Sequence, residues 1–310
     1  LRRLARSLLF CPHPTLFRSG LGNALPFPCA LGATAVLLEG PPMPDTICES
    51  LRTHNPTIFY GVPTLYAMLL ASDLIPDAED HALRLCVSAG EALPSDLLNR
   101  WADKMGTEIL DGLGSTEMLH IFLSNRPGDV EYGTSGTAVQ GYDVRLVDDD
   151  GADVPVGGMG EWLVQGNASA GDYVNQREKS RTTFVGEWTR TGYKYELSQN
   201  GRYIYCGRTD DMFKVSGIWV SPFEIEQALV EHPVILEAAV IAQRDSENLE
   251  KPKAFVVLKD GKTESDLDEV KDFIKEKIGK WKYPRWVEVI DDLPKTATGK
   301  IQRFKLRELV

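Results

Sequence analysis

The sequence predicts a large α/β domain followed by a small α+β domain. Its 310 residues correspond to about two domains at roughly 150 residues each. Between residues 20 and 110, short apolar runs alternate with helical segments, a pattern typical of a parallel sheet covered by helices. From 133 to 205, glycines separate short strands, and helical patterns return after Arg208. We therefore expect domains at 20–209 and 210–310, and leave residues 1–19 unassigned.

Periodicity assigns the elements of the large domain in order. The expected strands are 33–38, 57–60, 83–88 and 108–110, and the expected helices are 46–54, 64–72 and 95–104. Short strands are then expected at 143–147, 161–165 and 203–206. Asp150-Gly151 and Asn200-Gly201 indicate hairpin turns, because Asn, Asp and Gly tolerate positive φ. This second part is expected to be antiparallel and barrel-like.

The small domain begins with a helix-capping pattern. Ser221, Pro222 and Glu224 form a capping box with proline at the first helical position, which predicts a helix to about His232. The expected strands are 236–242, 253–258 and 286–290, with a helix over 265–278. About a hundred residues is a typical size for such a unit.

Composition excludes several function classes. The 34 basic and 45 acidic residues give a net charge of −11, which disfavours a nucleic-acid partner. The longest strongly apolar run, 30–38, is about half the length of a membrane-spanning helix, so no membrane partner is expected. Five cysteines without a CxxC pair indicate neither a zinc site nor a disulfide framework, and favour a cytoplasmic location.

Residues 1–19 are cationic and contain no acidic residue. The string Leu16-Phe17-Arg18-Ser19 resembles translated sequencing-adapter DNA, and the chain has no initiator methionine. We expect an N-terminally truncated piece of a longer protein with foreign sequence at its start, and assign no element to this stretch.

Two glycine turns follow neighbouring predicted strands. Ala89 and Gly90 follow one strand, and a glycine loop that begins at Asp111 follows the next. Neighbouring parallel strands would bring both turns to the crevice where open α/β sheets bind ligands. Each loop alone is more often an ordinary strand-end turn. A charged segment at 207–217 and a Gly/Thr-rich loop at 294–301 likewise have an ordinary interpretation, as a linker and an exposed loop.

The order of three motifs favours a functional site over ordinary turns and loops. GLGSTE (112–117), GRTDDMFKVSG (207–217) and PKTATGK (294–300) together resemble the acyl-adenylate-forming (AMP-binding) superfamily of acyl-CoA synthetases, peptide-synthetase adenylation domains and luciferases. Within it the chain is most similar to the benzoate-CoA ligase group, through GLGNALPFP (20–28), IFYGVPTLY (58–66), DGLGSTEMLHIFLSN (111–125) and DDMFKVSGIWVSPFEIE (210–226). The resemblance implies an AMP-forming aryl-acid CoA ligase that uses ATP, Mg²⁺ and coenzyme A in aromatic-acid degradation.

The resemblance also implies a role for each matching residue. The ATP and AMP contacts are Ala89, Gly90, Glu91, Asp111, Gly112, Thr116 and Arg208, and Glu117 is the residue associated with Mg²⁺. Asp210 is the hinge, Ser216 and Gly217 lie beside the CoA path, and Lys300 is the catalytic lysine. Tyr60, Gly114, His120 and Ile121 line the acyl pocket, although His120 has the alternative interpretation of a buried histidine at a helix start.

Two departures from the family pattern bear on activity. The Gly-rich TSGTTG-like loop that grips the β and γ phosphates has no counterpart upstream of Gly20, so we expect weak adenylation by this chain. The family's TGD, whose aspartate binds the ribose, is Thr191-Gly192-Tyr193 here. A tyrosine cannot accept the paired hydrogen bonds that a carboxylate accepts.

Two alternative functions stay open. An amino-acid adenylation domain would need an aspartate near Tyr60, and residues 55–65 contain none. A non-catalytic nucleotide- or acyl-binding remnant agrees with both departures, and an upstream extension carrying the phosphate loop would argue against it. The expected partner is a small aromatic carboxylic acid, and a homodimer is left open.

Overall fold

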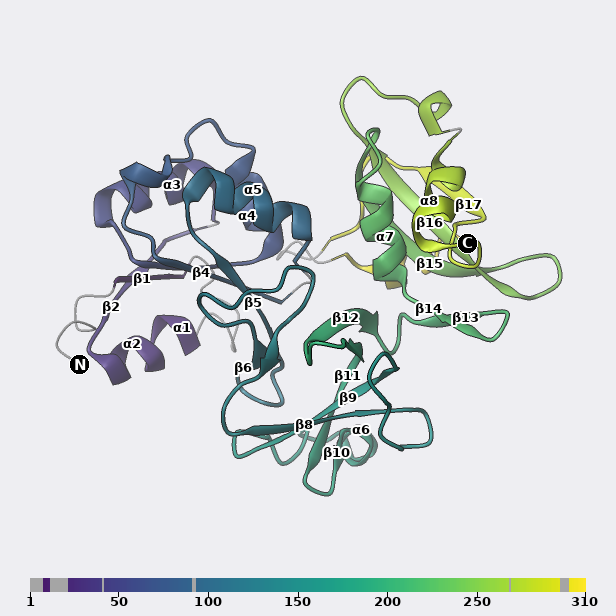
Figure 1. Cartoon of the computed structure of the whole chain (residues 1–310), viewed down its shortest axis with the longest axis horizontal. Coiled ribbons are helices and arrows are strands. Elements are labelled where there is room, and N and C mark those ends of the chain that lie inside the picture. Colours follow the sequence, from purple (N-terminus) through teal and green to yellow (C-terminus); the bar gives the residue numbers. More distant parts are fainter. Residues whose placement is uncertain (1–7, 12–21, 41, 91–92, 268, 296–300) are drawn as a thin grey trace. The chain divides into compact units, whose positions relative to one another are not determined.

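The computed structural model describes residues 8–11, 22–40, 42–90, 93–267, 269–295 and 301–310. They fall into two compact units (Figure 1). The large unit runs to Thr191 and includes Tyr195–Tyr205, whereas the small unit comprises Gly192–Lys194 and Cys206–Val310. The domain boundary expected at Asp210 stays a prediction. None of the described helices has the length and apolarity needed to cross a membrane.

The large unit contains a seven-stranded, mostly parallel sheet. Its strands are β1 (Leu8–Cys11), β2 (Thr34–Leu37), β3 (Ile58–Gly61), β4 (Leu85–Ala89), β5 (Ile109–Gly114), β6 (Ile121–Ser124) and β7 (Thr137–Ala138). Their spatial order is β2-β1-β3-β4-β5-β6-β7. The pairs from β2 to β5 are parallel, and β6 and β7 pair antiparallel. The predicted α/β architecture and all four predicted strands are confirmed.

Strand β1 lies in the stretch to which the sequence assigned no element. It is inserted between β2 and β3, with Phe10 opposite both Val36 and Phe59. Leaving Leu8–Cys11 out of the fold was therefore wrong. A four-residue apolar run inside a cationic stretch is too short to stand out as a strand.

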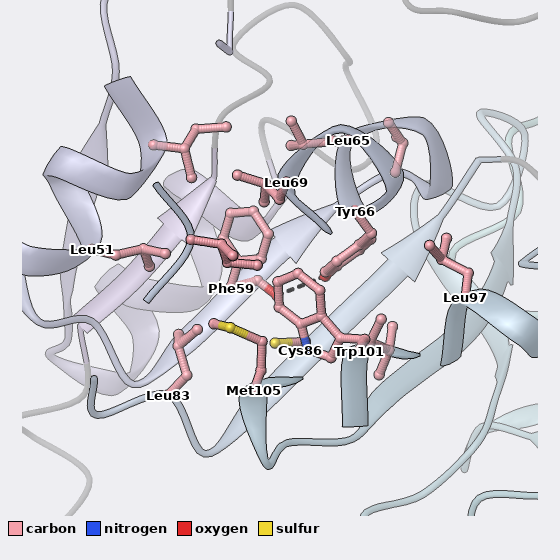
Figure 2. Close-up of a cluster of buried hydrophobic side chains, with 14 of the residues drawn as sticks. Leu51, Phe59, Leu65, Tyr66, Leu69, Leu83, Cys86, Leu97, Trp101 and Met105 are labelled. Atoms are coloured by element: carbon pink, nitrogen blue, oxygen red, sulfur yellow. Dashed lines mark hydrogen bonds between the residues drawn. The ribbon is translucent and has the colours of Figure 1, made fainter. Parts of the chain in front are cut away.

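Helices and their apolar side chains pack on this sheet. The helices are α1 (Gly22–Ala24), α2 (Pro26–Leu31), α3 (Pro44–His54), α4 (Pro63–Leu70) and α5 (Ser95–Met105). Figure 2 shows Phe59 of β3, Tyr66 of α4 and Trp101 of α5 at the centre of the main core cluster. The Tyr66 hydroxyl donates to the Val87 carbonyl of β4 at 2.9 Å. These contacts hold β3 and β4, whose C-terminal ends carry predicted site residues.

A second sheet belongs mostly to the large unit, and parts of its strands β11 and β12 belong to the small unit. It comprises β8 (Tyr142–Val147), β9 (Met159–Gly166), β10 (Phe184–Val185), β11 (Trp188–Leu197) and β12 (Tyr203–Arg208), and α6 (Arg177–Thr183) precedes β10. The order is β10-β11-β9-β8, with β12 paired to β11. The antiparallel expectation is confirmed by the β8–β9 and β10–β11 pairs. The barrel-like expectation is wrong, because the described strands form no closed barrel.

The small unit is the predicted α+β fold. It contains the hairpin β13 (Phe213–Val215) and β14 (Ile218–Val220), then α7 (Pro222–Val230), β15 (Ile235–Arg244), β16 (Glu250–Leu258), α8 (Val270–Ile278), β17 (Trp286–Val289) and α9 (Arg303–Arg307). Strand β16 pairs antiparallel with β15 and parallel with β17. The Glu224 N–H donates to Ser221 Oγ at 3.1 Å, which confirms the cap. The Glu224 carboxylate binds Lys282 Nζ at 2.5 Å, so it does not close the predicted capping box.

Candidate active site

The two predicted glycine turns lie on adjacent strands. Ser88 pairs with Asp111 and Ala89 with Gly112 across β4 and β5. Gly90, directly after β4, has a φ of 101° that glycine adopts most easily. The structure therefore brings Ala89, Gly90, Asp111 and Gly112 together at the C-terminal end of the parallel strands, where open α/β sheets bind ligands. Glu91 lies outside the described residues.

Asp111 is a buried carboxyl group that one hydroxyl holds in place. Ser135 Oγ donates to Asp111 Oδ2 at 2.8 Å, and the Ser135 oxygen lies 3.3 Å from the Tyr195 hydroxyl. Burial raises the pKa of Asp111 to about 7, against the opposing effects of the Ser135 hydroxyl and the Gly112 N–H. Since Tyr195 belongs to β11, this chain of polar groups links the parallel sheet to the antiparallel sheet.

Two glycines of β5 leave room for the chain that follows. A Cβ on Gly112 would lie 2.9 Å from Ile121 Cδ1, and a Cβ on Gly114 would lie 2.5 Å from the His120 carbonyl oxygen. Glycine is thus required for Ile121 and His120 to fold back against β5. Three of these four residues, Gly114, His120 and Ile121, are predicted acyl-pocket residues, and the structure brings them together. Tyr60 lies on β3, two strands from β5.

His120 is held by a segment far away in sequence. Its Nε2 lies 3.2 Å from Asn23 Oδ1, and the Phe27 ring meets it edge-on at 4.7 Å between centroids. A Cβ on Gly22 would lie 2.6 Å from the imidazole. His120 is partly exposed and precedes strand β6, so it is not a buried histidine at a helix start. Asn23 and Phe27 belong to the GLGNALPFP string but were not singled out.

Glu117 is fixed by a tyrosine that the sequence did not reveal. The Tyr173 hydroxyl donates to Glu117 Oε1 at 2.6 Å, and the Ala170 N–H donates to the Glu117 carbonyl at 2.7 Å. Burial acts to raise the pKa of Glu117, but the hydrogen bond from Tyr173 and the charge of Lys179 help to lower it overall. Glu117 is therefore anionic at neutral pH, while neighbouring Thr116 is exposed.

One ionised carboxylate fits the way proteins hold Mg²⁺ with nucleotides. Mg²⁺ is usually bound through one or two carboxylates plus substrate phosphates, with water completing the octahedron. Glu117 supplies one such carboxylate beside the exposed Thr116. Within the described ranges no three acidic, His or Cys residues cluster as a complete metal site. A metal here would depend on the phosphates of the nucleotide.

The small unit brings Arg208, Asp210 and Tyr193 together. Arg208 Nη2 lies 3.2 Å from Asp210 Oδ2, and the guanidinium lies 5.7 Å from the centre of the Tyr193 ring. Burial acts to lower the pKa of Arg208, but Tyr193 and the two aspartates at 210 and 211 raise it overall. Tyr193, which stands where the family has aspartate, thus contacts the arginine predicted to bind the ribose region.

Ser216 and Gly217 form the turn between β13 and β14. Their φ values are 50° and 84°, and both residues are exposed. Positive φ at both central positions is the geometry of a tight two-residue hairpin turn. The turn presents backbone without large side chains, as a CoA path would need. Lys300 lies outside the described residues.

Comparisons with known proteins identify the family of the chain. Residues 2–174 match the family described as AMP-binding enzyme, and residues 224–300 match the AMP-binding enzyme C-terminal domain. The chain is 55% identical over 303 residues to a benzoate–CoA ligase of Thauera aromatica, covering 97% of this chain and 58% of the relative. It is 54% identical to a 4-hydroxybenzoate–CoA/benzoate–CoA ligase of Rhodopseudomonas palustris, with 97% and 57% covered. The chain thus spans little more than half the length of these relatives.

Solved structures show the same fold. A benzoate CoA ligase from Burkholderia xenovorans LB400 superposes with a TM-score of 0.89 at 51% identity, covering 98% of this chain and 61% of that one. An anthranilate CoA ligase in complex with anthranoyl-AMP gives a TM-score of 0.90 at 45% identity, covering 98% and 60%. A large α/β domain followed by a small C-terminal domain is therefore the shared architecture.

Proposed function

Because the chain belongs to the family of AMP-binding enzymes, we propose that it is part of an AMP-forming aryl-acid CoA ligase of the benzoate type. The observation that carries the proposal is the 55% identity to a benzoate–CoA ligase across 97% of the chain. The close packing of His120 and Ile121 against Gly112 and Gly114 supports it, because the resemblance places Gly114, His120 and Ile121 in the acyl pocket.

The proposed reaction has two halves. The carboxylate of the acid attacks the α-phosphorus of ATP to give acyl-AMP and pyrophosphate, and the CoA thiol then displaces AMP. In the first half the Ala89 and Asp111 turns hold the adenine, and Thr116 and Arg208 hold phosphate and ribose. Glu117 is the protein ligand for Mg²⁺, which when bound neutralises charge on the phosphates. Lys300 stabilises the negative charge that builds between carboxylate and α-phosphate.

The second half is assigned to the small unit. Asp210 is the proposed hinge, and the turn at Ser216 and Gly217 is the proposed guide for the CoA thiol. The proposal extends to a cytoplasmic location and a role in aromatic-acid degradation, without a nucleic-acid or membrane partner. Light scattering of the purified chain tests whether it forms a homodimer.

Binding of a stable adenylate analogue tests the proposal directly. The chain is titrated calorimetrically with the sulfamoyl analogue of benzoyl-AMP, and with the acetyl analogue as a matched control. We expect saturable one-to-one binding of the benzoyl analogue and binding of the acetyl analogue that is weaker by about tenfold or more, since the ring fills apolar space. Absence of binding by both analogues would overturn a nucleotide function, and equal binding would overturn the aryl-acid assignment.

Tyr193 favours a second candidate function, nucleotide or acyl binding without turnover. It replaces a carboxylate that would accept two ribose hydrogen bonds, and it lies against Arg208 instead. Mixing the chain with ATP, Mg²⁺, benzoate and CoA separates the two candidates. Release of pyrophosphate with formation of the thioester supports the ligase, whereas analogue binding without either product supports the binding function.

A further inference from the structure

Four charged side chains of the small unit form one connected group, here termed the C-terminal ion cluster: Asp211, Glu226, Arg303 and Arg307. Arg303 Nη2 lies 2.7 Å from Glu226 Oε2, and Arg303 Nη1 lies 3.4 Å from Asp211 Oδ2. Arg307 Nη2 lies 2.6 Å from Asp211 Oδ1. The cluster therefore joins α9 to α7 and to the residue that follows the predicted hinge at Asp210.

Glu226 makes Arg303 difficult to replace. This glutamate is only 7% exposed, and its Oε1 accepts hydrogen bonds from the Val240 N–H at 2.7 Å and from Arg303 Nη2 at 2.9 Å. A buried carboxylate that loses its cationic partner is strongly destabilised. The planar fork of arginine contacts both carboxylate oxygens, which a lysine cannot reproduce with the same geometry.

The described residues on either side of 296–300 are tied to each other and to α9. Ile301 pairs with Lys295 in an antiparallel bridge, and the Gln302 N–H donates to the Pro294 carbonyl at 2.7 Å. One turn further on, Leu306 of α9 is fully buried in a small apolar cluster with Leu293. Residues 294–295 and 301–302 are thus tied to each other, and α9 ties them to the sheet.

We propose that Arg303 is a positioning residue for the adenylation reaction. Through Glu226 and Asp211 it anchors Ile301–Arg307, the segment that directly follows Lys300 in the sequence, to the body of the small unit. The inference rests on the proposed function, because it assumes that Lys300 meets the acyl and α-phosphate groups. The same bonds attach Asp211, the residue after the predicted hinge, to α9.

Acylation of lysines by benzoyl-AMP in the absence of CoA provides the test. A neutral lysine Nζ attacks the carbonyl carbon, the amide C–N bond forms, the bond from that carbon to the phosphate oxygen breaks, AMP leaves, and the proton passes to solvent. Peptide mass spectrometry gives the rate at Lys300 relative to Lys262, an exposed turn lysine. The 310-residue chain is compared with Arg303→Lys, Glu226→Gln and, as a matched control on α9, Lys305→Gln, at a temperature where circular dichroism shows each variant folded.

In the unaltered chain we expect Lys300 to react at least about tenfold faster than Lys262, since a bound adenylate raises the effective concentration of its carbonyl. Arg303→Lys and Glu226→Gln should lower that ratio about tenfold, because small misplacements of a reacting group cost rates of this order. Lys305→Gln should leave the ratio unchanged. If Arg303→Lys does not fold, Arg307→Gln, which removes only the more exposed arginine, should still lower the ratio about two- to threefold.

The two possible failures are distinguishable. A ratio that stays at the value of the unaltered chain in the folded variants would overturn the positioning role of Arg303 and leave the proposed function intact. A chain in which Lys300 reacts no faster than Lys262 would overturn the assigned role of Lys300, and the positioning inference would fall with it.

Discussion

A methyl group added at Gly112 or Gly114 of the large unit would lie 2.9 Å or 2.5 Å from its nearest neighbour, whereas one added at Gly217 of the small unit would meet nothing within 4 Å. Site residues of the large unit are thus held by close packing and by hydrogen bonds from Ser135 and Tyr173. The small unit itself is held together in part by ion pairs and by a helix cap. The comparison teaches that the two units should fail in different ways when altered.

The largest expected effect comes from filling the space beside β5. Gly114→Ala places its Cβ against the His120 backbone, which cannot move as a side-chain tip could. We expect the free energy of unfolding of the large unit to fall by about 3 kcal/mol, the upper range for overpacking. Urea unfolding measures the loss. Gly171→Ala, with nothing within 4 Å of the added Cβ, is the control and should change stability by less than about 0.5 kcal/mol.

The buried carboxyl of Asp111 gives the large unit a pH dependence. Its pKa is raised to about 7 from 3.8, so the unfolded chain releases this proton at lower pH than the folded chain. The stability contributed by the protonated form is present at low pH and is lost as pH rises through about 7. Relative to Asp111→Asn, the unaltered chain should gain about 2 kcal/mol between pH 7.5 and 5.5. Equal pH profiles in thermal unfolding would show that the carboxyl is not buried as described.

The cap of α7 is a contact of the small unit that one substitution removes. Ser221→Ala removes the acceptor of the Glu224 N–H and the hydroxyl that donates to the Cys206 carbonyl. Loss of an N-cap typically costs about 1 kcal/mol. Hydrogen exchange in α7 should rise accordingly, while Ser246→Ala in an exposed turn should leave exchange unchanged. A stability unaffected by Ser221→Ala would contradict the cap.

The smallest effect is expected for an exposed ion pair. Lys275 Nζ lies 2.7 Å from Asp272 Oδ1, one turn away on α8, and the aspartate side chain is 75% exposed. Lys275→Gln should change the free energy of unfolding by less than about 0.5 kcal/mol, because solvent and salt screen such pairs. A loss above 1 kcal/mol, measured by urea unfolding, would mean that exposed charges stabilise the small unit as strongly as packing stabilises the large one.

Much of the fold could be predicted because its elements carry local signals. The apolar runs around Phe59 and Cys86 marked β3 and β4, and the pattern from Ser95 marked α5. Strand β11 was missed because Gly192 interrupts it and charged residues line it. In the structure Arg190 pairs with Glu161, and Lys194 lies 4.1 Å from the Trp219 ring centre. Only tertiary partners make these residues suitable for a strand.

The same limit of local sequence signals applies to the candidate site. Motifs identified Asp111, Gly112 and Glu117 but not the residues that hold them. Ser135 is 24 residues from Asp111, Tyr173 is 56 from Glu117, and Asn23 is 97 from His120. No local pattern records contacts across such separations. The roles assigned to Lys300 and Glu91 stay predictions, since neither lies among the described residues.

Strand β2 is an edge strand of the seven-stranded sheet, and among the described strands it pairs only with β1. Its outer side therefore presents backbone N–H and C=O groups to any extended chain that approaches, and Leu37 on this strand is 66% exposed. Such an edge is a template for unwanted strand addition. Concentrated solutions of the chain should therefore aggregate through this edge before either unit unfolds. The substitution Leu37→Lys should delay this aggregation.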